Sequence, residues 1–145
     1  MPYTYEYAQI GVTVDIVLFA LEPEEYVQKV LLIERKNEPF KGKWALPGGF
    51  VDMDEDLETA CRRELEEETG LRVGELKQFK TYGSVDRDPR GRIISVIFYA
   101  FPEKELIPLA GDDAAKAQWF PLDNLPELAF DHQQIIDEFT SEIMR

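Results

Sequence analysis

The stretch Leu46–Leu71, "LPGGFVDMDEDLETACRRELEEETGL", sets two adjacent glycines before a segment crowded with glutamate. Four acidic residues fall within five positions: Glu64, Glu66, Glu67 and Glu68. The part from Asp56 to Thr69 is expected to be helical, and Gly70 stands where a left-handed residue ends many helices. Like charges one turn apart repel by roughly 0.2–0.5 kcal/mol, and anions are disfavoured near a helix C-terminus. The crowding therefore needs a reason beyond helix formation.

Helical periodicity separates these glutamates by direction. The apolar side of the expected helix carries Leu57, Ala60, Cys61 and Leu65. Glu64 and Glu68 fall in the middle of that side and Glu67 at its edge, whereas Glu66 faces solvent. Partly buried carboxylates require a cation or become protonated, and clustered oxygens suit Mg²⁺ or Mn²⁺. The alternative is a frayed last turn with all four glutamates in water.

The glycines that precede the helix are compatible with a ligand site. Gly48 and Gly49 lack a Cβ, so their main-chain groups can come close to a ligand. A plain turn between a strand and a loop would use the same residues.

Composition limits the range of functions. The chain has 145 residues, 44% of them hydrophobic, which predicts a single domain over residues 1–145. Its net charge of −13 disfavours non-specific binding to nucleic acid or anionic membranes. We expect no membrane span and no secretory signal, and the single cysteine, Cys61, fits a cytoplasmic location. An anionic small molecule would bind with a cation or at a local basic cluster.

The remaining sequence predicts strands and a second helix. A C-terminal amphipathic helix is expected over residues 131–145. The expected strands are Tyr7–Leu21, Tyr26–Lys36, 44–46, 71–85, 92–101 and 116–122. Strands mixed with two helices favour a layered α/β sandwich.

The acidic segment resembles the signature of the Nudix hydrolases, G-x5-E-x7-R-E-U-x-E-E-x-G-U, in which U is apolar. Gly49, Glu55, Arg63, Glu64 and the residues up to Leu71 fill every fixed position. The stretches "VLLIERKNEPFKGKWALPGGF", "DRDPRGRIISV" and "WFPLDNLPELAFDH" are similar to the branch that contains ADP-ribose pyrophosphatases and ligand-sensing domains of NAD-metabolism regulators.

This resemblance implies a Nudix-type α/β/α sandwich with a mixed β-sheet and a loop-helix-loop catalytic box. It also implies Mg²⁺-dependent cleavage of a nucleoside diphosphate linked to another group, with Mn²⁺ as an alternative ion. Glu64, Glu67, Glu68 and the carbonyl of Gly48 would hold the metal. Arg63, with Glu55, would orient the glutamates, and Glu64 acts as the base in some relatives. Gly49, Glu55 and Gly70 would support the box structurally.

Residues outside the box give weaker signals. Arg35 ends a strand where relatives often place a substrate-contacting arginine. The basic cluster could hold a phosphate or ribose, or could pair internally with Asp86 and Asp88; it comprises Arg87, Arg90 and Arg92. A base outside the box could be Asp112 or Asp113.

The single histidine and several apolar residues are more ambiguous. His132 is more often a hydrogen-bonded helix-start residue than a catalyst. Phe130 or Trp44 could stack an adenine, although aromatic residues more often belong to the core. Cys61 is interpreted as a small buried hydrophobe.

The resemblance predicts hydrolysis of ADP-ribose, or a similar small-molecule nucleotide, to AMP and a sugar phosphate. The rivals are a hydrolase of oxidised nucleoside triphosphates such as 8-oxo-dGTP, and a non-catalytic ADP-ribose sensor. Such sensors continue into a DNA-binding module, whereas this sequence ends at Arg145 after one helix and is acidic. We therefore expect no nucleic-acid partner. Enzymes of this type are often dimers, so a homodimer is an alternative that the residues do not decide.

Overall fold

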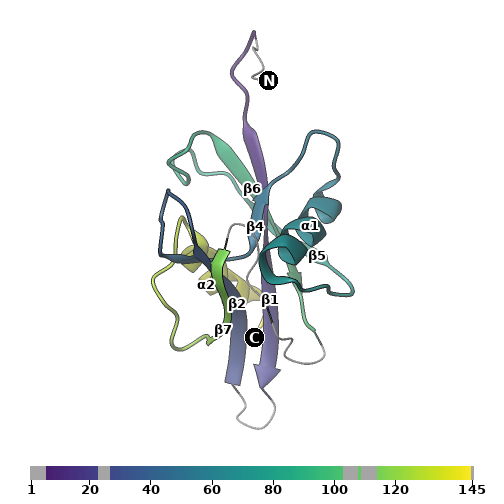
Figure 1. The fold of residues 1–145 in the computed structure, drawn as a ribbon, viewed down its shortest axis with the longest axis vertical. Helices are drawn as coiled ribbons and strands as arrows, with labels where there is room; N and C mark the ends of the chain where they lie inside the picture. The colour runs from purple at the N-terminus through teal and green to yellow at the C-terminus, as the bar shows by residue number, and fades with distance from the viewer. Residues whose placement is uncertain (1–5, 23–26, 103–107, 109–113, 145) are drawn as a thin grey trace.

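A mixed sheet lies between two helices in the computed structural model, which describes residues 6–22, 27–102, 108 and 114–144 (Figure 1). Within those residues the helices are α1 (Leu57–Thr69) and α2 (His132–Ile143). The strands are β1 (Gly11–Glu22), β2 (Val27–Arg35), β3 (Trp44–Ala45), β4 (Gly48–Phe50), β5 (Lys77–Tyr82), β6 (Ile93–Ala100) and β7 (Ala114–Pro121). The predicted layered α/β sandwich is confirmed.

The sheet is organised around β1. Its strand order is β3-β2-β1-β6-β5, with β4 paired to β1 and β7 paired to β2. The pair β1–β6 is parallel, and the other pairs are antiparallel. The short strand β4 therefore brings the start of the glutamate-rich segment beside β1.

Strand β1 is buried on both faces, which explains its continuous apolar run. Val14, Ile16 and Leu18 pack with Ala60, Cys61 and Leu65 of α1 on one face. On the other face, Val17 and Phe19 pack with residues of α2: Ile135, Ile136 and Phe139. The alternation of side chains along the strand thus joins both helices to the same sheet.

Some predicted boundaries are wrong. The first strand begins at Gly11 rather than Tyr7, and both Tyr7 and Ile10 are exposed. Only Lys77–Tyr82 of the expected strand 71–85 is extended in the sheet. Residues 48–50, expected to lie in a loop, form β4, because Gly48 allows the backbone to approach β1. A Cβ at Gly48 would lie 2.1 Å from the carbonyl oxygen of Val14.

Candidate functional site

The C-terminal half of α1 turns two of its glutamates toward the sheet. Glu68 is only 5% exposed, and the side chain of Glu64 is 13% exposed. Glu66 and Glu67 are exposed. The helix continues to Thr69 and ends at Gly70, which adopts the predicted left-handed conformation with φ 72°. The direction that periodicity predicted for Glu64 and Glu68 is confirmed, and the alternative of a frayed last turn is wrong.

The two glycines of β4 allow the backbone to contact these carboxylates. The N–H of Gly48 donates to Oε1 of Glu68 at 2.7 Å. A Cβ at Gly49 would lie 2.6 Å from the carboxyl group of Glu64. Real Cβ atoms essentially never approach so closely, so Gly48, which faces the backbone of β1, requires glycine, and a side chain at Gly49 would displace the carboxylate of Glu64. The pair is therefore a close-approach element and not a plain turn.

Arg63 joins the loop before α1 to the glutamates of the helix. It donates two hydrogen bonds to Glu55, at 2.6 and 2.8 Å, and one to Glu64 at 2.8 Å. Weaker contacts reach Glu67 at 3.2 Å and the carbonyl of Phe50 at 3.1 Å. The hydrogen bonds from Arg63, and then the N–H of Asp52, lower the pKa of Glu55 to about 2. Arg63 thus connects Glu55 of the loop with Glu64 and Glu67 of the helix, a contact that helical periodicity does not predict.

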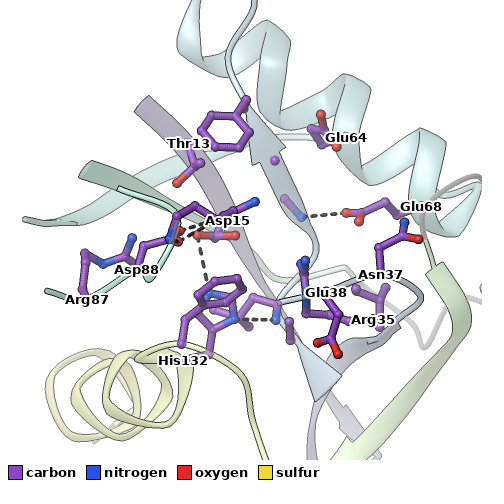
Figure 2. Close-up of a pocket in the computed structure, with 18 of the residues that line it drawn as sticks. Thr13, Asp15, Arg35, Asn37, Glu38, Glu64, Glu68, Arg87, Asp88 and His132 are labelled. Carbon is purple, nitrogen blue, oxygen red and sulfur yellow. Dashed lines mark hydrogen bonds and ion pairs between the residues drawn. The ribbon is translucent and has the colours of Figure 1, made fainter. Parts of the chain in front are cut away.

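A cavity of about 420 Å³ opens beside this cluster (Figure 2). It lies where α1, β4, the end of β2, the β5–β6 loop and the start of α2 meet. Its polar lining residues are Thr13, Asp15, Arg35, Asn37, Glu38, Asp52, Glu64, Glu68, Arg87, Asp88, Arg90 and His132. Two box glutamates, Glu64 and Glu68, and three of the predicted arginines therefore share one cavity, whereas Glu67 does not line it.

Two of these arginines are already paired with aspartates. Arg87 donates to Asp131 at 2.9 and 2.6 Å, and its side chain is 3% exposed. Arg90 donates to Asp88 at 3.0 and 2.7 Å. The internal pairing considered for the basic cluster is therefore present at Arg90, but Arg87 pairs with the start of α2.

Within the described part of the chain, Arg35 is the cavity arginine that forms no ion pair with an aspartate or glutamate. Its Nε donates to the carbonyl of Pro39 at 2.7 Å, and its guanidinium lies 5.0 Å from the ring centre of Phe130. No carboxylate of the described residues lies within 4.0 Å of its guanidinium nitrogens. Burial, and then the charge of Arg90, lowers the pKa of Arg35. An anion beside Arg35 would offset both effects.

Arg92 does not line the cavity. It is exposed, and it donates a long hydrogen bond of 3.5 Å to the carbonyl of Ser84. The turn before β6 brings Arg87 and Arg90 to the cavity. Arg92 follows that turn, directly before β6 starts at Ile93, and lies at a separate surface depression.

The cavity also contains residues that the sequence did not single out. Asp15 is 7% exposed and accepts a hydrogen bond from Ser95 Oγ at 2.5 Å. Its carboxylate lies 3.7 Å from Nε2 of His132. His132 begins α2 and is hydrogen-bonded, as expected, but it also belongs to the cavity. The sequence signal that could have identified Asp15 is a charged residue inside the apolar run "VTVDIVLF".

The side chains of the cavity provide some, but not all, of the oxygen ligands that a hard divalent cation would need. Among the described residues, no three acidic, histidine or cysteine side chains are gathered closely enough to hold a metal. Glu64 and Glu68 line the same cavity beside the glycine backbone, which is the oxygen chemistry such an ion prefers. Glu67 is turned toward Arg63 and would join them only after leaving it.

The remaining predicted residues divide between cavity and core. Phe130 lines the cavity, whereas Trp44 packs against Phe120 with ring centres 4.7 Å apart. Cys61 is buried, as expected. Asp112 and Asp113 lie outside the described residues.

Comparison with known proteins places this site in a family. The NUDIX domain family matches residues 10–141. An ADP-ribose pyrophosphatase of Methanocaldococcus jannaschii is 51% identical over 111 residues, covering 77% of this chain and 65% of that protein. The ADPR responsive transcriptional repressor NtrR of Acinetobacter baylyi is 33% identical over 137 residues, covering 92% of this chain and 54% of the repressor. The chain thus spans between half and two thirds of these relatives.

A solved structure supports the same fold. The NUDIX domain of Shewanella oneidensis NrtR complexed with ADP ribose superposes with a TM-score of 0.88 and 34% identity. The superposition covers 94% of this chain and 90% of that domain. The Nudix-type sandwich expected from the signature is therefore confirmed. Neither α1 nor α2 has the length and apolar character that a membrane-spanning helix requires.

Proposed function

The chain belongs to the Nudix family, and we propose that it hydrolyses the diphosphate bond of ADP-ribose to give AMP and ribose 5-phosphate. The observation that carries this proposal is the single cavity that contains the carboxylates of Glu64 and Glu68 and the cation of Arg35 (Figure 2). The relative named ADP-ribose pyrophosphatase and the solved domain complexed with ADP ribose support this choice of substrate.

The size of the cavity suits a nucleoside diphosphate sugar. Its volume of about 420 Å³ falls in the usual range for small-molecule sites. The substrate is an anion and the chain carries a net charge of −13, so binding needs local positive charge. Arg35 provides such a charge and forms no ion pair within 4.0 Å with a carboxylate of the described residues, and arginine matches phosphate oxygens well.

In the proposed mechanism, Glu64, Glu67, Glu68 and the carbonyl of Gly48 would hold a divalent cation, Mg²⁺ or Mn²⁺. When bound, this ion supplies charge neutralisation for the diphosphate oxygens. Arg63 orients Glu64 and is itself held by Glu55. Glu64 lies in the cavity and is the candidate to accept the proton of the attacking water. Release of Glu67 from Arg63 would accompany metal binding.

Product analysis tests the proposal. Purified protein would be incubated with Mg²⁺ and either ADP-ribose or 8-oxo-dGTP, and the products separated by chromatography. We expect AMP and ribose 5-phosphate to form with the higher kcat/KM. Faster release of pyrophosphate from 8-oxo-dGTP would overturn the substrate assignment and leave the reaction class standing.

A second candidate function is ADP-ribose sensing without cleavage, which the similarity to the repressor NtrR favours. The high negative charge argues against direct contact of this domain with DNA. Calorimetric binding of ADP-ribose in the presence of Mg²⁺, with no AMP formed over hours, would support the sensor and exclude the hydrolase.

A further inference from the structure

Two polar contacts lead beside the cavity from Asp15 of β1, through His132, to the segment that carries Gly48 (Figure 2). Asp15 of β1 accepts a hydrogen bond from Ser95 and faces Nε2 of His132 at 3.7 Å. On the other side of its ring, His132 accepts the N–H of Leu46 through Nδ1 at 2.9 Å. Asp15 and His132 are 7% and 3% exposed, so water does not compete strongly for these groups.

The contact with Leu46 determines where the proton of the imidazole resides. Because Nδ1 accepts an N–H, the ring proton is on Nε2, on the side of Asp15. Asp15 accepts the hydroxyl of Ser95 at 2.5 Å and faces Nε2 of His132 at 3.7 Å, so its carboxylate is directed at that ring nitrogen. An ionised Asp15 favours the Nε2–H tautomer and therefore keeps Nδ1 available as an acceptor.

The backbone of residues 46–48 is fixed at each of its three positions. The N–H of Leu46 is held by His132, and the carbonyl of Pro47 accepts the N–H of Ile16 at 2.9 Å. The N–H of Gly48 is held by Glu68 at 2.7 Å. Pro47 has no N–H, so His132 and Glu68 account for both N–H groups of the segment. Loss of either acceptor would leave a buried donor unsatisfied and loosen the segment.

We propose that Asp15 and His132 are positioning residues that fix residues 46–48 and thereby set the affinity of the site for a divalent cation. The inference rests on the proposed function only in placing that cation at Glu64, Glu68 and Gly48. It does not depend on which nucleotide is cleaved. Groups that orient metal ligands typically change metal affinity by about 10- to 100-fold when they are removed.

Two substitutions of His132 separate its contacts. His132→Asn places an amide oxygen near the position of Nδ1, so it retains an acceptor for Leu46. His132→Gln places its amide near Nε2 and removes that acceptor. Mn²⁺ affinity would be measured by titration of the full chain, and amide hydrogen exchange would be followed at Leu46 and Gly48.

We expect His132→Gln to weaken Mn²⁺ binding by about 10- to 100-fold and to accelerate exchange at both amides. His132→Asn should retain most of the affinity and the protection. Equal loss in the two variants, or unchanged Mn²⁺ affinity in His132→Gln despite faster exchange, would overturn the proposal. If His132→Gln does not fold, Asp15→Asn provides the test.

In Asp15→Asn, ¹⁵N NMR should show that the imidazole of His132 no longer occupies the Nε2–H tautomer alone, and Mn²⁺ affinity should fall by several-fold or more. An unchanged tautomer together with unchanged affinity would overturn the role of Asp15. Mn²⁺ binding without cleavage of ADP-ribose would overturn the proposed function and leave this inference standing, so the two failures are distinguishable.

Discussion

At the scale of single residues, Gly49 has no room for a side chain. A Cβ there would lie 2.6 Å from the carboxyl group of Glu64. Gly49→Ala should therefore displace that carboxylate and lower the metal-dependent kcat/KM by about 10- to 100-fold. Steady-state kinetics with ADP-ribose and Mg²⁺ measures the effect.

Gly74→Ala is the matched control for Gly49→Ala. A Cβ at Gly74 meets nothing within 4 Å, so this variant should keep the wild-type kcat/KM. Equal activity of the two variants would mean that contact with Gly49 does not position Glu64.

Arg35 and Arg92 differ in a way that predicts opposite outcomes. Arg35 lines the cavity without a carboxylate partner in the described residues, whereas Arg92 is exposed and lies outside the cavity. Loss of one charged hydrogen bond typically costs about 1.5–3 kcal/mol, roughly 10- to 150-fold. Arg35→Ala should lower kcat/KM for ADP-ribose by that factor, and Arg92→Ala should change it little. A larger loss for Arg92→Ala would contradict the placement of the phosphate at Arg35.

At the scale of elements, the pair Glu55–Arg63 fastens the loop before α1 to the helix. The pKa of Glu55 is about 2 in the folded chain, against a usual value of 4.5. The unfolded chain therefore takes up this proton at a higher pH than the folded chain. The contribution of the pair to stability is present above about pH 4.5 and is lost as the pH falls toward 2.

The variant Glu55→Gln isolates this contribution. At pH 7 without metal, its Tm should be lower than that of the wild type. The difference between the two Tm values should shrink as the pH is lowered through the window from 4.5 to 2. Thermal scans by circular dichroism would show this, and a difference that is constant over the window would exclude ionisation of Glu55 as its cause.

Helix α1 bears like charges at Glu64 and Glu68, near its C-terminus. Glu68→Gln removes the repulsion and retains an oxygen that can accept the N–H of Gly48. We expect metal-free Tm to stay constant or rise, while Mg²⁺-dependent turnover falls by roughly 100-fold or more. Activity within a few-fold of wild type would show that Glu68 does not hold the metal.

The control within the same helix is Glu66→Gln. Glu66 is exposed and pairs with Arg72 at 2.9 Å. Exposed ion pairs contribute about 0–1 kcal/mol, so this variant should change Tm and turnover little.

At the scale of the whole molecule, the sequence predicts features that depend on neighbouring residues better than contacts between residues far apart in the chain. The ends of α1 and the direction of Glu64 and Glu68 follow from 3.6-residue periodicity and a terminal glycine, which are local signals. The pairing of Arg87 with Asp131, 44 positions away, and of Leu46 with His132, 86 positions away, depends on how β1 and α2 pack. No local signal predicts such partners, which is why the sequence leaves open whether these arginines contact a ligand or pair with aspartates.

Cys61 reports on the opening of the packing between α1 and the sheet. It is 2% exposed between α1 and the sheet, and burial, with a smaller effect of Asp15, raises its pKa to about 12. At pH 8 the native thiol is therefore almost entirely un-ionised, and it is shielded from reagents. A disulfide reagent should therefore react mainly through opened molecules.

Ligands that bind only the native fold should slow this reaction by mass action. Because the chain has one cysteine, release of the coloured thiol product measures opening at that position alone. We expect reaction within seconds in concentrated urea, far slower reaction in buffer, and a further decrease on addition of Mn²⁺ with AMP, which is not consumed. If buffer and urea gave the same rate, the thiol would be accessible in the native fold. A rate in buffer that Mn²⁺ and AMP leave unchanged, together with slow native reaction, would mean that these ligands do not bind the folded domain.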